Sequence, residues 1–486
     1  MGLSTLKHFL KDTLIYGLAT VLPRVINFLL VKIHTVALLP SDYADNTNFY
    51  IWAGLLAVLL TYGMETSFFR FYNSEKDKDS LISTGFIAIC ITTALFVLVG
   101  FLGSSFLVNL FDFEANPLRL KLLIAILALD TLAVIPFAYL RAVNKSVKYA
   151  SIKLINVGVI VVINLVFLKF IPEFINEGKA LPALIENNYG FTPMVNYIFI
   201  ANLAGSLISL VLLLPYLSKF KWSFNKTLLY KMLNYGWPIL VAGLAYVINE
   251  NLDKYLIGKL VDKEAMGLYS AAYKLAIFMN LYIMAFKLGA EPFFFNQSAK
   301  ENAKQVYALI LKYFSIVGAF AFLAIVVFID IVKYFINNNY WEALKIVPVI
   351  LFANLLLGIY HNLSVWYKLT DKTTFAMYFS WLAALVTIVV NLTFIPIYGY
   401  MASAWATLLA YGCMVIASYF FGRKYYPVPY EIKQITFYLA VAIVLATTSF
   451  VYFRNQLIIS VLLLMVYGCV LLIFEYKNLK TIILKK

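Results

Sequence analysis

Polar side chains inside long apolar segments are the part of this sequence that could do chemistry. On the first segment, residues 12–39, five of them fall within a sector of roughly 80° at helical periodicity: Tyr16, Thr20, Arg24, Asn27 and His34. A charge at the centre of a membrane helix costs roughly 2.5–3.5 kcal/mol, so such a stripe faces a protein interior or water. Pro23 can open the helix beside Arg24 and free a carbonyl. Arg24 is therefore the strongest binding candidate.

Further stripes follow on later segments and complete the candidate site. We predict that a substrate cavity is lined by Arg24, Asn27, His34, Lys153, Asn156, Asn164, Tyr246, Asn249, Tyr273, Asn280 and Lys287. Three carboxylates on the same stripes, Glu250, Asp253 and Glu291, are predicted to exchange a coupling ion. Asp130 aligns with Arg141, and Asn354 with His361. The alternative interpretation is that these groups pair with one another and only fix helix packing.

Catalytic and metal-binding motifs are mostly missing from the sequence. It contains no GxxxxGK, HExxH or GxSxG pattern, so ATP hydrolysis and the familiar protease and hydrolase layouts find no support. The run Asp77–Asp79 matches a DxD pattern, but it lies in a short charged loop and is interpreted as solvated. Cys90, Cys413 and Cys469 lack CxxC spacing. We expect neither an enzyme nor a cofactor or metal site.

The composition requires a membrane. Hydrophobic residues make up 63% of the 486, charged residues only 13%, and the mean hydropathy is +0.85; a soluble domain has about 25% charged residues. Apolar runs long enough to cross a bilayer predict an all-α polytopic membrane protein with about fourteen helices, near 12–39, 44–72, 81–110, 117–141, 149–171, 193–217, 228–259, 265–296, 304–336, 342–367, 373–395, 400–421, 433–453 and 457–474.

Basic residues alternate between the loops. Those on the side of the N-terminus carry many lysines, whereas the opposite loops hold only Lys179, Lys263 and Arg454. Because cytoplasmic loops are enriched in Lys and Arg, both termini are predicted to be cytoplasmic in a multi-pass protein of the inner membrane. The same bias explains the net charge of +15, so no nucleic acid partner is implied.

The sequence contains an internal repeat whose second copy begins near residue 235. Tyr16-Gly17 recurs as Tyr235-Gly236, Glu65 aligns with Glu291, and Arg141 aligns with Lys368. Internal repetition of this kind is typical of transporters. An even number of helices per copy gives both copies the same orientation. We therefore predict two pseudo-symmetric six-helix lobes, residues 1–217 and 228–421, with two appended helices in 433–474.

Three stretches resemble bacterial polysaccharide flippases of the multidrug/oligosaccharidyl-lipid/polysaccharide exporter superfamily: LPRVINFLLVKIHTVALLPSDY, YGMETSFFRFY and NENLDKYLIGKLVDKEAMGLYSAAYKLA. The resemblance implies a cavity between two lobes that opens alternately to the two sides of the inner membrane. The implied substrate is an undecaprenyl-pyrophosphate-linked oligosaccharide for surface polysaccharide assembly. In the related lipid II flippases an arginine of the first helix acts in the cavity and two C-terminal helices hold the lipid tail; Arg24 and residues 433–474 match these in kind.

The expected partners follow from the same residues. Arg24, Lys153 and Lys287 would bind pyrophosphate through charge-assisted hydrogen bonds, amides and tyrosines would select the glycan loosely, and H⁺ or Na⁺ would be the coupling ion. A lipid II flippase and a cation-coupled multidrug exporter are the alternatives within the superfamily. A membrane-embedded polysaccharide polymerase or ligase is the alternative from another class. Such enzymes commonly have a large outer loop, and the longest outer loop predicted here is only residues 172–191.

The loop charges give a testable topology. In a variant without native cysteines, a cysteine placed at Gly178 should react with a membrane-impermeant reagent added from outside the cell, and one at Lys221 should not. The opposite labelling pattern would reverse the predicted orientation.

Overall fold

The computed structural model describes residues 21–72, 74–113, 116–186, 189–217, 222–298, 300–370 and 372–484. Within these ranges every regular element is a helix and no strand occurs. The expected all-α class is confirmed. The chain divides into two compact units, Met1–Ser270 and Ala271–Lys486, called unit 1 and unit 2 below.

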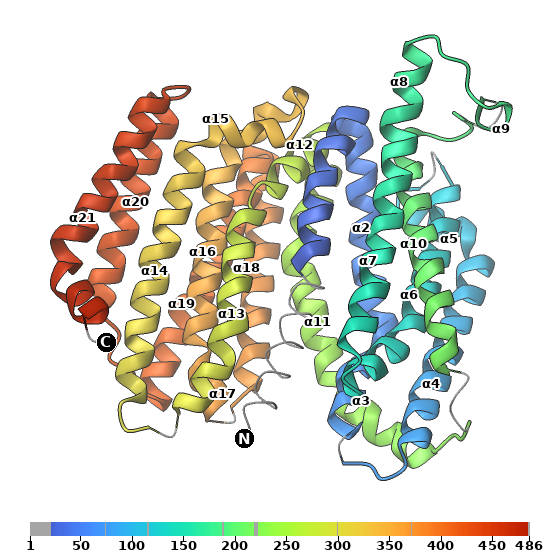
Figure 1. Cartoon of the computed structure of the whole chain (residues 1–486), viewed down its shortest axis with the longest axis horizontal. Helices are drawn as coiled ribbons and strands as arrows, with labels where there is room; N and C mark the ends of the chain where they lie inside the picture. The colour runs from blue at the N-terminus through green and yellow to red at the C-terminus, as the bar shows by residue number, and fades with distance from the viewer. Residues whose placement is uncertain are drawn as a thin grey trace. The chain divides into compact units, whose positions relative to one another are not determined.

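Unit 1 begins, in its described part, with a helix over residues 21–37. It continues with α2 (Pro40–Thr61), α3 (Met64–Tyr72), α4 (Lys78–Leu102), α5 (Ser104–Leu110), α6 (Leu118–Ala142), α7 (Ser146–Leu165), the π-helix η1 (Val166–Phe170), α8 (Ile171–Asn176), α9 (Ala183–Glu186), α10 (Met194–Leu217) and α11 (Lys226–Leu260) (Figure 1). The boundary between the units lies within α12 (Lys263–Lys274).

Unit 2 contains α13 (Ile277–Gln297), α14 (Ala303–Val327), α15 (Ile329–Val332), the 3₁₀ helices η2 (Lys333–Phe335) and η3 (Asn338–Ile346), α16 (Val347–Leu363), α17 (Val365–Leu369), α18 (Thr374–Tyr398), α19 (Tyr400–Tyr425), α20 (Ile432–Tyr452) and α21 (Leu457–Leu484). α16 packs against α19 and α14, and α18 packs along α19. These contacts form the body of the unit.

Each expected segment from 44–72 onward coincides with one helix or with consecutive helices. In the described part of the chain, 11 helices are long and apolar enough to span a membrane, or 12 if the bent pair α12–α13 is one span. α11 is not among them, and the first expected segment begins outside the described residues. The count of fourteen therefore stays a prediction.

The predicted lobes, 1–217 and 228–421, also stay a prediction. They rest on sequence repetition, whereas the two compact units reflect contacts within the chain, which is a different criterion. By contacts, α11 belongs with unit 1, where it packs along α2, α3 and α4.

A close backbone contact joins α11 to the break between α2 and α3. Tyr62 and Gly63 adopt positive φ values of 35° and 74° at this break. A Cβ atom on Gly63 would lie 2.5 Å from the carbonyl oxygen of Gly236 on α11, so only glycine allows this approach. Ser67 Oγ donates to the carbonyl oxygen of Met232 at 2.9 Å and adds a hydrogen bond between the same helices. The kink thus fixes α11 within unit 1.

At the opposite end of α2, buried charges tie four helices together. Arg119 of α6 is 3% exposed and forms an ion pair with Asp45 of α2 at 2.9 Å. Asp45 also pairs with Lys263 of α12 at 3.1 Å, and Arg119 Nε donates to Asn196 Oδ1 of α10 at 3.2 Å. Lys263, a loop cation in the sequence, is therefore part of an ion-pair network at this helix end.

The appended helices α20 and α21 are attached to unit 2 by charges at both ends. Figure 1 shows them alongside α14. At one end Lys312 of α14, 1% exposed, pairs with Glu475 at 2.7 Å and with Glu431 at 3.2 Å. Tyr438 donates to Glu475 at 2.9 Å. Because a buried charge needs compensation, this triad anchors α20 and α21 to α14.

At the other end Asp330 of α15 lies beyond the apolar span of α14. It pairs with Arg454 at 2.7 Å and with Lys333 at 3.0 Å, and it accepts a hydrogen bond from the Asn455 backbone at 2.6 Å. Burial alone would raise the pKa of Asp330, but the hydrogen bonds from Arg454, Asn455 and Lys333 hold that pKa well below its usual range. The carboxylate stays charged and closes the second attachment.

The first attachment gives a stability prediction. Lys312→Met should lower the unfolding temperature of the purified protein in detergent, because it leaves Glu475 charged, buried and without its cation, a loss of about 3–5 kcal/mol. The double variant Lys312→Met/Glu475→Gln should regain part of this stability, and the exposed Lys300→Met should match wild type. Equal unfolding temperatures for the single and double variants would contradict the ion-pair account.

Candidate functional site

The site residues predicted on unit 1 lie on the helix over residues 21–37, on α7 and on α11, and Asp130, noted for its alignment with Arg141, lies on α6. On α7, Lys153 is partly buried and its ammonium lies 4.2 Å from the ring centroid of Phe137. Lys153 also interacts electrostatically with Asp130 of α6, which is hydrogen-bonded to Ser206 of α10. An acid and a base thus lie near each other within apolar helices.

Two amides of α7 have partners on neighbouring helices. His34 Nε2 lies 2.8 Å from Asn164 Oδ1, and Asn164 Nδ2 donates to the carbonyl oxygen of Ile160 at 2.8 Å. Asn156 Nδ2 donates to Ser209 Oγ of α10 at 3.0 Å. Of the predicted residues, the structure brings His34 and Asn164 together. Since Asn164 is fully buried, its first role is to hold α7 against the helix over 21–37.

Three other predicted residues are open to their surroundings. Arg24 and Asn27 are exposed on the helix over residues 21–37, and Tyr246 of α11 is 62% exposed. Arg24 interacts electrostatically with Tyr246, as does Glu250 one turn further along α11. Arg24, Tyr246 and Glu250 are therefore neighbours within unit 1, as the stripes predict for residues of one site.

The remaining candidates on α11 are buried. Asp253 is 1% exposed, and its oxygens meet Lys254 Nζ at 3.1 Å and Tyr269 Oη at 2.7 Å. Lys254 also donates to the carbonyl oxygen of Glu250. Asn249 is 8% exposed. Asp253 therefore has its charge balanced by protein groups, and its role in ion exchange stays a prediction.

Unit 2 holds the other predicted residues. Tyr273 of α12 is partly buried and Asn280 of α13 is exposed. The side chain of Glu291 lies outside the described residues, although its backbone belongs to α13. Lys287, also on α13, is partly buried and lines a pocket.

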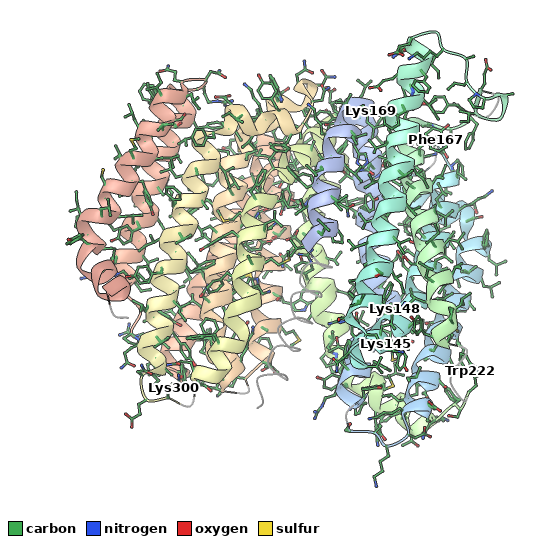
Figure 2. All side chains as sticks on the ribbon, viewed as in Figure 1. Lys145, Lys148, Phe167, Lys169, Trp222 and Lys300 are labelled. Atoms are coloured by element: carbon green, nitrogen blue, oxygen red, sulfur yellow. The ribbon has the colours of Figure 1, made fainter. Side chains whose placement is uncertain are left out.

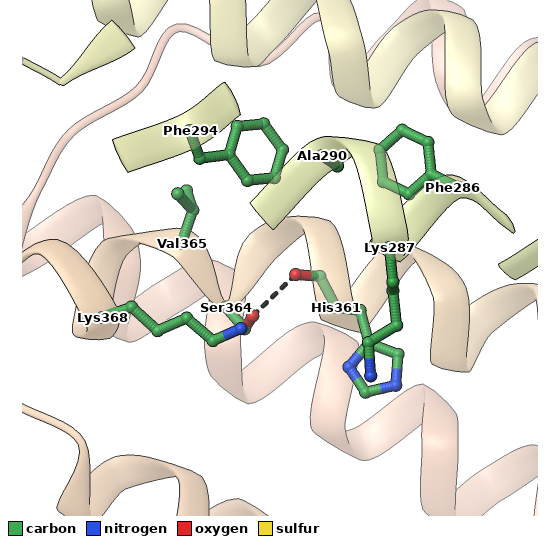
Figure 3. Close-up of a pocket in the computed structure, with 8 residues that line it drawn as sticks. All are labelled: Phe286, Lys287, Ala290, Phe294, His361, Ser364, Val365 and Lys368. Carbon is green, nitrogen blue, oxygen red and sulfur yellow. Dashed lines mark hydrogen bonds between the residues drawn. The ribbon is translucent and has the colours of Figure 1, made fainter. Parts of the chain in front are cut away.

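This pocket brings Lys287 together with His361 and Lys368, two basic residues that the cavity prediction left out. His361 of α16 and Lys368 of α17 line it beside Lys287, and Ser364 lies between them (Figure 3). Both lysines interact electrostatically with the His361 imidazole. Ser364 Oγ donates to the carbonyl oxygen of His361 at 2.6 Å. The remaining wall is apolar: Phe286, Ala290, Phe294 and Val365. We call this site the basic pocket.

Sequence reasoning noted His361 as aligned with Asn354 and Lys368 as the repeat equivalent of Arg141, but it assigned neither to a site. Asp130 was likewise noted only for its alignment with Arg141. A stripe on one helix does not reveal which other helix faces it. For Lys368 the internal repeat was the available signal. Lys368 aligns with Arg141, and both are basic residues near the end of a helix.

A family model described as polysaccharide biosynthesis protein matches residues 9–296, and a second, described as MatE, matches residues 238–393. No curated protein matches the sequence. The lipid II flippase MurJ, in an inward closed conformation, aligns with a TM-score of 0.71 at 16% identity, over 96% of this chain and 100% of that one.

Two further solved structures share the fold. An inward-facing multidrug resistance MATE family transporter of the MOP superfamily gives a TM-score of 0.64 at 12% identity, over 85% of this chain and 95% of that one. A MOP superfamily transporter from Pyrococcus furiosus gives 0.54 at 13% identity, over 87% and 94%. The expected resemblance to the exporter superfamily is confirmed.

The exposed Arg24 gives a prediction with a matched control. Arg24→Ala should abolish transport of the expected pyrophosphate-linked substrate at unchanged expression, because the substitution removes a cation that would bind phosphate oxygens. Lys169→Ala should change transport little. Lys169 is exposed on η1, near one end of the continuous helix formed by α7, η1 and α8, and Lys145 and Lys148 lie near the other end (Figure 2). At a helix end the long side chain of lysine can reach the lipid head groups. Equal transport by both variants, measured in vesicles, would remove Arg24 from the site.

Proposed function

Because this chain belongs to the polysaccharide biosynthesis protein family, we propose that it is a flippase. It moves an undecaprenyl-pyrophosphate-linked oligosaccharide from the inner to the outer leaflet of the cytoplasmic membrane. The pyrophosphate and the sugar hydroxyls cannot cross hydrocarbon without partners. The protein supplies polar partners along the path while the polyprenyl chain stays in lipid.

The observation that carries this proposal is the polar set of unit 1. Asp130, Lys153 and Ser206 lie on three helices that are otherwise apolar enough to span a membrane, and Asp130 interacts with each of the other two. Ionisable residues inside spans face a protein interior or water and mark the path of a polar substrate. Arg24, exposed on a neighbouring helix of the same unit, adds a cation suited to phosphate.

The transport cycle is proposed to be alternating access by the two repeats, with both termini in the cytoplasm. Glu250, Asp253 and Glu291 are the proposed exchange sites for H⁺ or Na⁺. A change of charge between loaded and empty states lets the membrane potential bias the cycle, at about 2.3 kcal/mol per charge per 100 mV.

A second candidate is a cation-coupled exporter of hydrophobic drugs. The MatE match to residues 238–393 favours it, and the multidrug resistance transporter named above has the same fold. Lipid II is another candidate substrate, since the fold of the lipid II flippase MurJ aligns over 96% of this chain.

Reconstituted transport separates these candidates. In liposomes, the wild-type protein should move polyprenyl-pyrophosphate glycans of several sugar compositions to the opposite leaflet, and it should not move a polyprenol glycoside that lacks phosphate. Lys153→Met should reduce the rate at least ten-fold because it removes the cation inside the span, whereas the exposed Lys148→Met on the same helix should match wild type.

Two results would contradict the proposal. Equal movement of the phosphate-free glycoside would show that the anion is not recognised. Uptake of a hydrophobic drug cation in place of the glycolipid would favour the exporter. Movement of lipid II alone, with no other glycan accepted, would narrow the function to the lipid II branch.

A further inference from the structure

We propose that an apolar groove between α4 and α11 of unit 1 binds one hydrocarbon chain of a membrane phospholipid, and that Lys226 binds the anionic head group of this lipid. The groove has a free volume of about 400 Å³, and its α11 wall includes Leu229, Leu233, Trp237 and Leu240. We call it the lipid groove. The inference goes beyond the proposed function, because this lipid is held by the protein and is not its transported substrate.

The lipid groove has the size of a ligand site. Its volume of about 400 Å³ lies within the range of about 300–1,000 Å³ that is usual for ligand pockets, whereas the basic pocket of unit 2 has a free volume of about 10 Å³. The space exists because α4 contributes the short side chains of Ala88 and Thr92. The Thr92 hydroxyl donates to the carbonyl oxygen of Ala88 at 3.1 Å. A ligand in the groove therefore meets mainly hydrocarbon and aromatic rings.

Both walls of the lipid groove are held in place by packing. Met232 and Gly236 of α11, which contact α3 and the break before it, each precede a residue of the α11 wall in the sequence. On the α4 side, Ala88 is 7% exposed and belongs to the same core cluster as Met232. The groove is therefore formed before a ligand enters it, as is usual for a binding site.

The length of the lipid groove matches one leaflet of the bilayer. The α11 wall runs from Leu229 to Leu240, which at 1.5 Å per residue is about 16 Å. Half of the hydrocarbon core is about 15 Å. Trp222 precedes α11, is exposed, and lies toward the same end of unit 1 as Lys145 and Lys148 (Figure 2). Because tryptophan is enriched at the level of the head groups, the groove starts at the membrane surface on the predicted cytoplasmic side.

Lys226 stands at this surface end, on the same face of α11 as the groove wall. It is the first residue of α11, and the spacing of Lys226, Leu229, Leu233, Trp237 and Leu240 keeps all five within a sector of roughly 80°. Lys226 is exposed and forms no ion pair with another described residue. An exposed ammonium group there can bind a phosphate oxygen through a charge-assisted hydrogen bond.

The cation decides which lipid fits the lipid groove. Hydrocarbon surrounds every membrane protein, so an apolar surface by itself selects no ligand. A phospholipid has its phosphate at the membrane surface, where Lys226 lies, and a chain long enough for one leaflet. The proposed lipid-linked substrate instead brings its pyrophosphate to Arg24 and Lys153. The position of Lys226 at the head-group level therefore favours a resident anionic phospholipid over the chain of the substrate.

The test counts bound lipid by native mass spectrometry of the delipidated full-length protein in detergent. The probes are a phosphatidylglycerol, a phosphatidylethanolamine with the same chains, and a polyprenyl phosphate. Leu233→Trp and Ile91→Trp, which fill the groove from its two walls at exposed positions, should each weaken phosphatidylglycerol binding at least ten-fold. Leu212→Trp is the matched control, because Leu212 on α10 is 37% exposed against 40% for Leu233 and does not line the groove.

The head-group assignment is tested with a second pair of variants. The wild type should bind phosphatidylglycerol at least five-fold more tightly than phosphatidylethanolamine, and Lys226→Gln should remove this preference. Lys231→Gln should keep the preference, because Lys231 lies on the opposite face of α11 and pairs with Glu75 at 3.5 Å.

Three results would overturn the proposal. The first is wild-type affinity for phosphatidylglycerol in both Trp variants, each with a normal elution profile. The second is equal affinity of the wild type for the two phospholipids, which would exclude an anionic head group at Lys226. The third is tighter binding of polyprenyl phosphate than of phosphatidylglycerol, lost in the Trp variants, which would assign the groove to the substrate chain.

Discussion

The cost of placing a charged or hydrogen-bonding group among apolar helices governs this structure. In the described chain this cost is met in two ways. Some groups are buried and paired, such as Lys312 with Glu475 and Asp253 with Lys254 and Tyr269. Others, such as Arg24 and Tyr246, stay exposed within their unit. The first kind fixes helices to one another, and the second kind remains accessible within its unit.

This distinction separates predicted site residues that hold helices together from those that could contact a substrate. Asn164 is fully buried and bonded to His34, so its loss would first loosen α7. Lys153 is only partly buried and lies near Asp130, so it can respond to a charged substrate.

Close helix contacts set where these groups lie. The break at Tyr62 and Gly63 lets α11 approach α2 and α3 until the Gly63 and Gly236 backbones touch. Side chains larger than hydrogen would separate the helices at that point. Further along, Asp45 shared by Arg119 and Lys263 joins α2, α6 and α12. Together these contacts hold α11, and with it Tyr246 and Glu250, next to the first helices of unit 1.

The sequence by itself determined that the protein is helical and lies in a membrane, because hydropathy and segment length are local properties. It also determined which face of each helix is polar, since helical periodicity needs no knowledge of the neighbours. Only the tertiary structure decided which polar faces meet. Lys312 and Glu431 are 119 residues apart, and nothing in either segment predicts their contact. Lys287, His361 and Lys368 converge for the same reason: helix packing, not spacing along the chain, places residues of α13 against those of α16 and α17.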